Sequence, residues 1–205
     1  MKHILKHKWE LVLVLALLTG LALGTVSQNK PDWRDKLIRL HVVANSDSAV
    51  DQAQKLKVRD AVLEAVSPIL EETADATEAK MRLQQNLKAL ESAANKALAG
   101  TGKRASVTLQ REVFPLREYE TFSLPAGEYE ALRVTIGDGA GQNWWCVVYP
   151  SLCLAATAEE VTELAVSAGL SEEEAALLTG RQSGYVFRFQ IVELWQRLVN
   201  WLRSL

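Results

Sequence analysis

Cysteine and histidine, which often act as nucleophiles, bases or metal ligands, are scarce in this sequence. Its 205 residues include only two cysteines and three histidines, and His41 is the one histidine beyond the first ten residues. Two cysteines are too few for a disulfide-stapled scaffold or for a zinc site built from cysteines alone. The formal net charge is −2, so there is no net basic field to hold nucleic acid. We therefore expect no metal, no cofactor and no nucleic-acid partner.

Long apolar runs are also missing, except at the amino terminus. Residues 11–26 form such a run behind a basic segment with three lysines, and Ala22 and Gly24 supply small side chains. This order is typical of a secretory signal peptide. The run is shorter than the roughly 20 residues of a membrane-spanning helix, and an uncleaved anchor stays as the alternative. We predict a signal peptide over 1–24, a linker over 25–36 and a single secreted domain over 37–205, with membrane contact through the amino-terminal segment.

Two helix starts are marked in the first half of the predicted domain. Ser48 is followed by Asp51 and Asp75 by Glu78, a spacing that resembles a capping box at a helix start. Apolar residues at helical spacing follow each signal, and Pro68 is expected to end or kink the first helix.

Period-two alternation marks the strands. A first strand precedes the helices, and further strands follow them. A mixed tail comes last, with two short helices, a possible strand over 185–191 and a helical pattern from residue 191. Segregated elements of this kind predict an α+β fold, in which two helices cover one face of a largely antiparallel sheet. The predicted strands span residues 37–44, 105–114, 129–136 and 144–149, and the short helices span 158–168 and 171–179.

The two cysteines lie seven residues apart around a Tyr149-Pro150 dipeptide. If that dipeptide is a two-residue turn, Val148 faces Ser151 and Cys146 faces Cys153, close enough for a disulfide. Proline at the second central position of such a turn favours a cis peptide bond. The alternative is two separate buried thiols.

A cysteine hydrolase is a competing hypothesis. Cys146 could act as nucleophile and His41 as base, with Asn143 or Asp138 orienting the imidazole. However, a nucleophilic cysteine usually lies at a helix start, where the helix dipole lowers its pKa.

The glycine-rich loop 137–141 lacks the Lys-Ser/Thr of a phosphate-binding loop and does not open a helix. We therefore assign no catalytic residue.

Aromatic residues suggest interaction surfaces. Trp144 and Trp145 are adjacent in a predicted strand, so one indole is expected to enter the core and the other to face outward. An exposed tryptophan is a common binding hot spot, and it also suits a wall- or glycan-binding module. Residues 191–205 have helical spacing with Trp195 and Trp201, and could dock into the domain or lie on a membrane.

Four segments in order resemble one family. Residues 38–48 lead into a helix bearing residues 56–62, and residues 124–132 and 143–153 follow. Together they are similar to stage II sporulation protein R of endospore-forming bacteria, over about residues 37–153.

The resemblance implies a signalling protein and not an enzyme. Members are exported from the forespore into the space between two membranes. There they activate a membrane-embedded aspartic peptidase, which leads to processing of the mother-cell sigma-E precursor. We expect the peptidase to be contacted by the 45–48 turn, the 125–129 turn and the 137–145 loop. The named candidates are Asn45, Ser46, Asp47, Pro125, Gly127, Tyr129, Asn143, Trp144 and Trp145.

Overall fold

The computed structural model describes residues 32–180. The predicted signal peptide, most of the predicted linker and the amphipathic segment 191–205 lie outside the described residues. Among residues 32–180, no helix is both long and apolar enough to cross a membrane.

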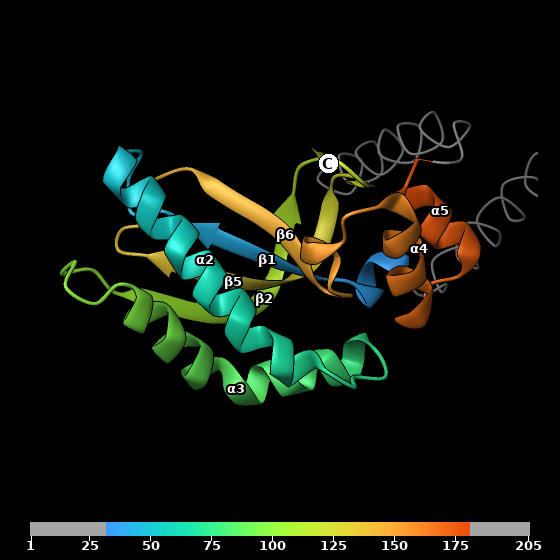
Figure 1. The fold of residues 1–205 in the computed structure, drawn as a ribbon, viewed down its shortest axis with the longest axis horizontal. Coiled ribbons are helices and arrows are strands. Elements are labelled where there is room, and N and C mark those ends of the chain that lie inside the picture. Colours follow the sequence, from blue (N-terminus) through green and yellow to red (C-terminus); the bar gives the residue numbers. More distant parts are fainter. Residues whose placement is uncertain (1–31, 181–205) are drawn as a thin grey trace, which may run out of the picture. The chain divides into compact units, whose positions relative to one another are not determined.

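Two long helices separate the first strand from the others (Figure 1). Between the strands of the sheet lies a hairpin of two very short strands, and the described chain closes with two short helices. In chain order the elements are η2 (Trp33–Lys36), β1 (Ile38–Val43), α2 (Ala49–Leu70), α3 (Ala76–Ala97), β2 (Ala105–Phe114), β3 (Arg117–Glu118), β4 (Ser123–Leu124), β5 (Gly127–Ile136), β6 (Asn143–Tyr149), η3 (Leu152–Leu154), α4 (Ala158–Ser167) and α5 (Glu172–Leu178).

The main sheet has four strands in the order β2-β5-β1-β6. β2 and β5 pair antiparallel, as do β1 and β6, whereas β1 and β5 run parallel. The predicted α+β fold is confirmed, and the sheet is mixed because the crossover through α2, α3 and β2 brings β5 alongside β1 in the same direction. Alternation along a strand carries no information on the direction of its neighbour.

Both predicted caps start the long helices. The Ser48 hydroxyl accepts a hydrogen bond from the Asp51 N–H, and the Asp75 carboxylate accepts one from the Glu78 N–H. These bonds satisfy backbone donors that a helix start leaves unpaired. Pro68 lies in the last turn of α2, which ends at Leu70.

The two helices bury their apolar stripes against one face of the sheet (Figure 1). Val58 and Val62 of α2 and Leu83 and Leu90 of α3 are fully buried there, opposite strand residues such as Leu40. Burial of each such side chain stabilises the fold by about 1.5–3 kcal/mol.

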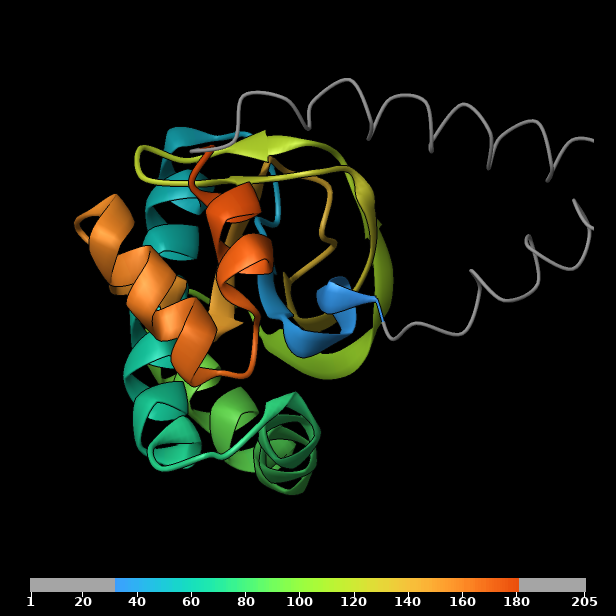
Figure 2. The same ribbon diagram turned by 90° about the vertical axis from the view of Figure 1, so that its right-hand side faces the viewer.

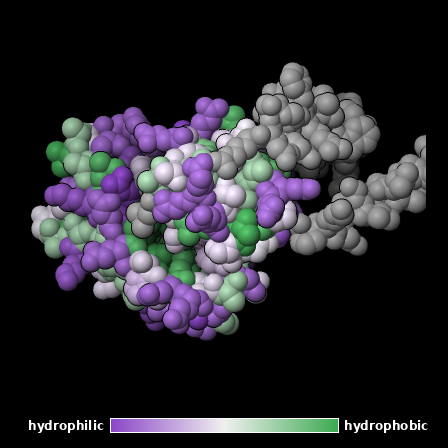
Figure 3. All heavy atoms as spheres, turned by 45° about the vertical axis from the view of Figure 1, so that its right-hand side comes forward, coloured by the Kyte–Doolittle hydropathy of each residue, from purple (hydrophilic) through white to green (hydrophobic). Residues whose placement is uncertain are grey.

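A second core lies on the other face of the sheet. Its strand residues include Phe114, Tyr129 and Val147, and α4 and α5 contribute Val161 and Leu178. Figure 2 shows the α4–α5 pair, which covers one end of this face of the sheet. The other end of the face is open, because Thr108 and Asn143 are exposed there. In the space-filling view hydrophilic residues cover much of the visible face, and hydrophobic residues show in a hollow and in smaller separate patches (Figure 3).

Candidate functional site

Two of the three predicted contact segments meet at one end of the sheet. The Asp138 N–H donates to Asn45 Oδ1 at 3.1 Å, and the Gln142 N–H donates to Asp47 Oδ1 at 2.7 Å. The Ala140 N–H bonds the Asn45 carbonyl oxygen at 3.1 Å. We call residues 45–48 and 137–142 the loop cluster. Its backbone is held in one arrangement by these bonds, so a partner would meet a preorganised surface.

Asp51 anchors the loop cluster to the start of α2. Its Oδ2 accepts hydrogen bonds from Asn45 Nδ2 at 2.8 Å and from Ser46 Oγ at 2.6 Å. Its Oδ1 forms an ion pair with Lys103 Nζ at 2.5 Å. The hydrogen bonds from Asn45, Lys103 and Ser46 hold the pKa of this carboxyl far below its usual value. Asp51 therefore stays ionised and keeps the turn in place.

Gly141 is where the two loops approach most closely. A Cβ at this position would overlap the carbonyl group of Ser46 and lie 2.9 Å from the Ala44 Cβ. The Gly141 N–H also donates to the Ala44 carbonyl oxygen at 2.9 Å. The glycine at position 141 is thus explained by loop packing.

The third predicted segment lies elsewhere. Gly127 and Ile136 are the two ends of β5, so the turn at Pro125 is separated from the loop cluster by roughly 30 Å of strand. Tyr129 is fully buried, and its hydroxyl donates to the Pro125 carbonyl oxygen at 2.8 Å. Its role is to hold the turn, and it has no surface to offer a partner. Gly127 is covered by the Arg34 side chain.

The predicted disulfide joins Cys146 and Cys153, with the two Cα atoms 5.6 Å apart. The Tyr149-Pro150 peptide bond is cis, as the turn argument favoured. The same argument implied that the residues after the turn pair with β6 as a second strand. That expectation is wrong, because the chain after Ser151 forms the short 3-10 helix η3. The Leu152 N–H already bonds the Pro150 carbonyl oxygen at 2.7 Å, which bends the chain away from a strand pairing.

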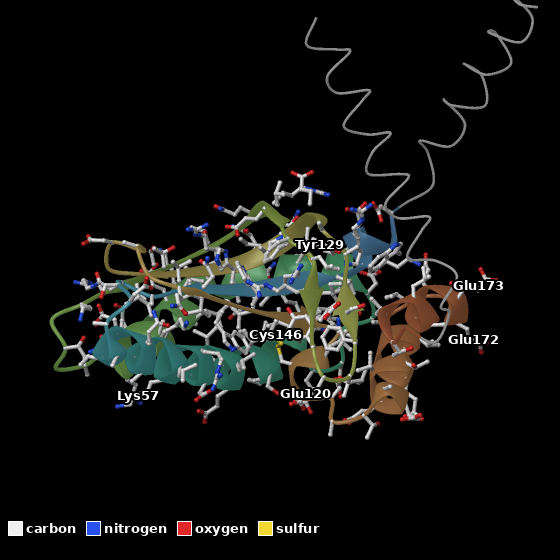
Figure 4. The ribbon with its side chains drawn as sticks, turned by 90° about the horizontal axis from the view of Figure 1, so that it is seen from above. Lys57, Glu120, Tyr129, Cys146, Glu172 and Glu173 are labelled. Carbon is white, nitrogen blue, oxygen red and sulfur yellow. A yellow bond between two sulfur atoms is a disulfide. The ribbon has the colours of Figure 1, made fainter. Side chains whose placement is uncertain are left out.

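The cysteine hydrolase hypothesis is contradicted by this geometry. Both cysteines of the chain are in the disulfide. Cys146 lies opposite Leu40 in the β1–β6 ladder and shares its face, whereas His41 pairs with Trp145 and points to the other face. Figure 4 shows Cys146 on the α2 side of the sheet and Tyr129 on the far side.

His41 is instead the centre of a polar cluster on the open face of the sheet. Its Nδ1 lies 2.6 Å from Glu112 Oε2, and its Nε2 lies 2.8 Å from Asn143 Oδ1. Arg133 Nη1 donates to Glu112 Oε1 at 3.1 Å. Burial raises the pKa of Glu112, but hydrogen bonds from His41 and Arg133 outweigh it and leave that pKa below its usual value. With both ring nitrogens engaged, His41 positions Asn143 beside the loop cluster.

A fully buried arginine was not predicted. Arg39 donates from Nη2 to the Tyr119 hydroxyl at 3.2 Å, and its guanidinium lies 4.0 Å from the centre of the Phe114 ring. Burial lowers its pKa. The alternation of β1 placed Arg39 beside His41 on one face, but the sequence could not show that β3 and β4 would cover it.

Comparison with known proteins assigns the chain to a family. Residues 34–159 match the family model of stage II sporulation protein R. The chain belongs to the stage II sporulation protein R family. It is 34% identical over 152 residues to the stage II sporulation protein R of Bacillus subtilis (strain 168), across 69% of this chain and 68% of that protein. No solved structure matches.

In this stage II sporulation protein R family member, the matched range contains the whole main sheet, the disulfide and the loop cluster. It begins in η2 and ends at the second residue of α4, so α5 lies beyond it. Among residues 32–180, no group of three or more potential metal-ligating side chains is present.

The tryptophan pair of this family member is covered by cations. Trp144 and Trp145 lie on opposite faces of the sheet, as predicted, but both are half-buried. The Arg59 guanidinium lies 4.9 Å from the centre of the Trp144 ring system, and that of Arg117 lies 3.9 Å from that of Trp145. Neither indole faces fully outward, contrary to the expectation for one of them, which weakens the hypothesis of a glycan-stacking platform.

Proposed function

We propose that this chain is an exported signalling protein of endospore formation that activates a membrane-embedded aspartic peptidase. Activation then leads to processing of the mother-cell sigma-E precursor. The observation that carries the proposal is the match of residues 34–159 to the stage II sporulation protein R family. The signal-like segment before residue 25 and the Cys146–Cys153 disulfide support export, because disulfides persist in oxidising compartments.

Activation in this proposal proceeds by binding alone. The domain contacts the active arrangement of the peptidase more favourably than its resting arrangement, and so shifts the population toward activity. No bond is made or broken by the domain itself. In support, Cys146 is held in the disulfide and both ring nitrogens of His41 are engaged.

The loop cluster and Asn143 are the proposed contact surface at one end of the sheet. Asn143 is exposed, and its Oδ1 is held by His41 Nε2 at 2.8 Å. Asp47 is exposed beside Gln142, to which its carboxylate is bonded. Because these groups are fixed before binding, little conformational entropy is lost when a partner docks.

Complementation in sporulating cells tests the proposal. The full chain is expressed in the forespore of a strain that lacks its own signalling protein, and cleavage of the sigma-E precursor is followed by immunoblot. We expect cleavage to be restored by the full chain. A matched chain without residues 1–24, which would stay in the cytosol, is expected to restore nothing. An uncleaved precursor with the full chain present and exported would contradict the proposal.

A further inference from the structure

The outer edge of β2 is protected over only half of its length. β2 is an edge strand, since β5 is its one neighbour in the sheet. The Ala105 N–H and carbonyl both bond the Asn95 side chain, and the Val107 N–H donates to Glu91 Oε2 at 3.2 Å. Two side chains of α3 therefore occupy the edge at residues 105 and 107, as natural proteins do to block unwanted strand pairing.

Farther along β2 the edge is open. The backbone groups of alternate residues in an edge strand point outward, so those of Leu109, Arg111 and Val113 follow Ala105 and Val107 in facing away from β5. Within residues 32–180, none of these three residues has a backbone hydrogen bond on that outer side. Three consecutive outward positions are thus available to a further strand.

The side chains beside this open edge suit a protein partner. Val113 is 82% exposed and Leu116 is 59% exposed, the first at the end of β2 and the second just beyond it. The Arg111 guanidinium is bound to Asp35 at 3.0 Å and to Glu128 of β5 at 3.5 Å. These ion pairs involve the side chain alone, and the backbone N–H of Arg111 takes no part in them.

We propose that an extended segment of the receptor peptidase adds to β2 as a fifth strand along Leu109, Arg111 and Val113. This inference rests on the proposed function and gives it a binding mode. Backbone hydrogen bonds to the three residues supply affinity, and an apolar side chain of the segment packs against Val113. The segment is expected to alternate apolar and polar residues.

A second copy of this chain fits the edge less well. The symmetric antiparallel register that pairs all three open residues of one copy with all three of the other places Arg111 opposite Arg111. Like charges directly opposite one another destabilise a sheet. Registers shifted toward the start of β2 meet the positions that Glu91 and Asn95 already occupy.

Proline at Arg111 tests the open edge directly. Arg111→Pro removes an outward N–H and places a ring on the edge, but leaves the bonds to β5 intact. We expect precursor cleavage and binding to the receptor peptidase to fall at least about tenfold, since one backbone hydrogen bond is lost and the proline ring keeps the added strand from approaching the edge. Arg111→Ala keeps the N–H, so it is expected to bind at least about tenfold more tightly than Arg111→Pro. Glu172→Pro, at the first position of α5 where proline is tolerated, is the matched control and should match wild type.

A cross-link keeps the inference testable if the proline variant does not fold. A photo-reactive residue at Val113 of the full chain should cross-link to the peptidase in sporulating cells, and one at exposed Val166 of α4, away from both β2 and the loop cluster, should not. Wild-type activation with undiminished Arg111→Pro activity, or without a Val113 cross-link, would overturn the open-edge inference and leave the proposed function standing. Absence of activation by wild type would overturn both. A dimer that Arg111→Pro converts to a monomer would instead assign the edge to a second copy.

Discussion

Substitution of Gly141 by alanine is expected to separate the two loops of the loop cluster. The added Cβ overlaps the Ser46 carbonyl group and lies 2.9 Å from the Ala44 Cβ, and backbone atoms cannot rotate out of the way. Overpacking of this kind costs about 1–3 kcal/mol. Displacement of the loop also weakens the bonds from Gly141 N–H to Ala44 and from Ala140 N–H to Asn45, at about 1 kcal/mol each.

The expected loss in the free energy of unfolding for Gly141→Ala is therefore about 3 kcal/mol. For a domain of this size that lowers the melting temperature by about 6–12 °C, measurable by circular dichroism. Gly169→Ala is the matched control, because Gly169 has φ of +89° and nothing within 4 Å of an added Cβ. It loses about 1 kcal/mol from backbone strain alone. A Gly141→Ala protein as stable as Gly169→Ala would refute the close approach of the two loops.

Three further predictions concern the buried groups. Replacing both Cys146 and Cys153 by serine should lower the free energy of unfolding by about 2–3 kcal/mol, because the short loop between them is no longer closed; urea unfolding with unchanged stability would contradict this. Arg39→Met should change that free energy by less than about 1 kcal/mol, since it removes a buried charge whose Nε and Nη1 have no hydrogen-bond partner among residues 32–180, and a loss several times larger would show that the charge is needed. Because the pKa of Glu112 is lowered on folding, its contribution to stability is present above the ordinary value of 4.5 and is lost as the pH falls below it. Wild type should therefore lose stability more steeply in acid than Glu112→Gln, and equal slopes would count against the His41–Glu112 contact.

Local signals in the sequence predicted most elements. Ser48 and Asp75 cap the helices because capping depends on residues three apart in the chain. The Cys146–Cys153 disulfide followed from the distance across a short bend, even though η3 replaced the expected strand. Such local signals cannot predict which strands pair when the strands are far apart in the sequence. Neither the parallel β1–β5 pair nor the cover that β3 and β4 provide over Arg39 leaves a mark in local periodicity.

The candidate site shows the same division. The Asn45 turn and the glycine-rich loop were both recognised as turns, but only the strand order brings them together. Glu112 was missed as the partner of His41, and Arg133 as the partner of Glu112, because they come from two other strands. Tyr129 was a contact candidate because it closes the Pro125–Tyr129 turn, whereas its ring is fully buried in the second core.

Reconstitution tests the central claim, activation by contact, most directly. The peptidase is placed in lipid vesicles with the sigma-E precursor on the side of its catalytic domain, and the oxidised, signal-free chain is added to the opposite side. Addition of the chain is expected to start precursor cleavage. The cleavage rate is expected to rise with the amount of added chain until the peptidase is saturated. Cleavage at the same rate with and without the chain would contradict the account.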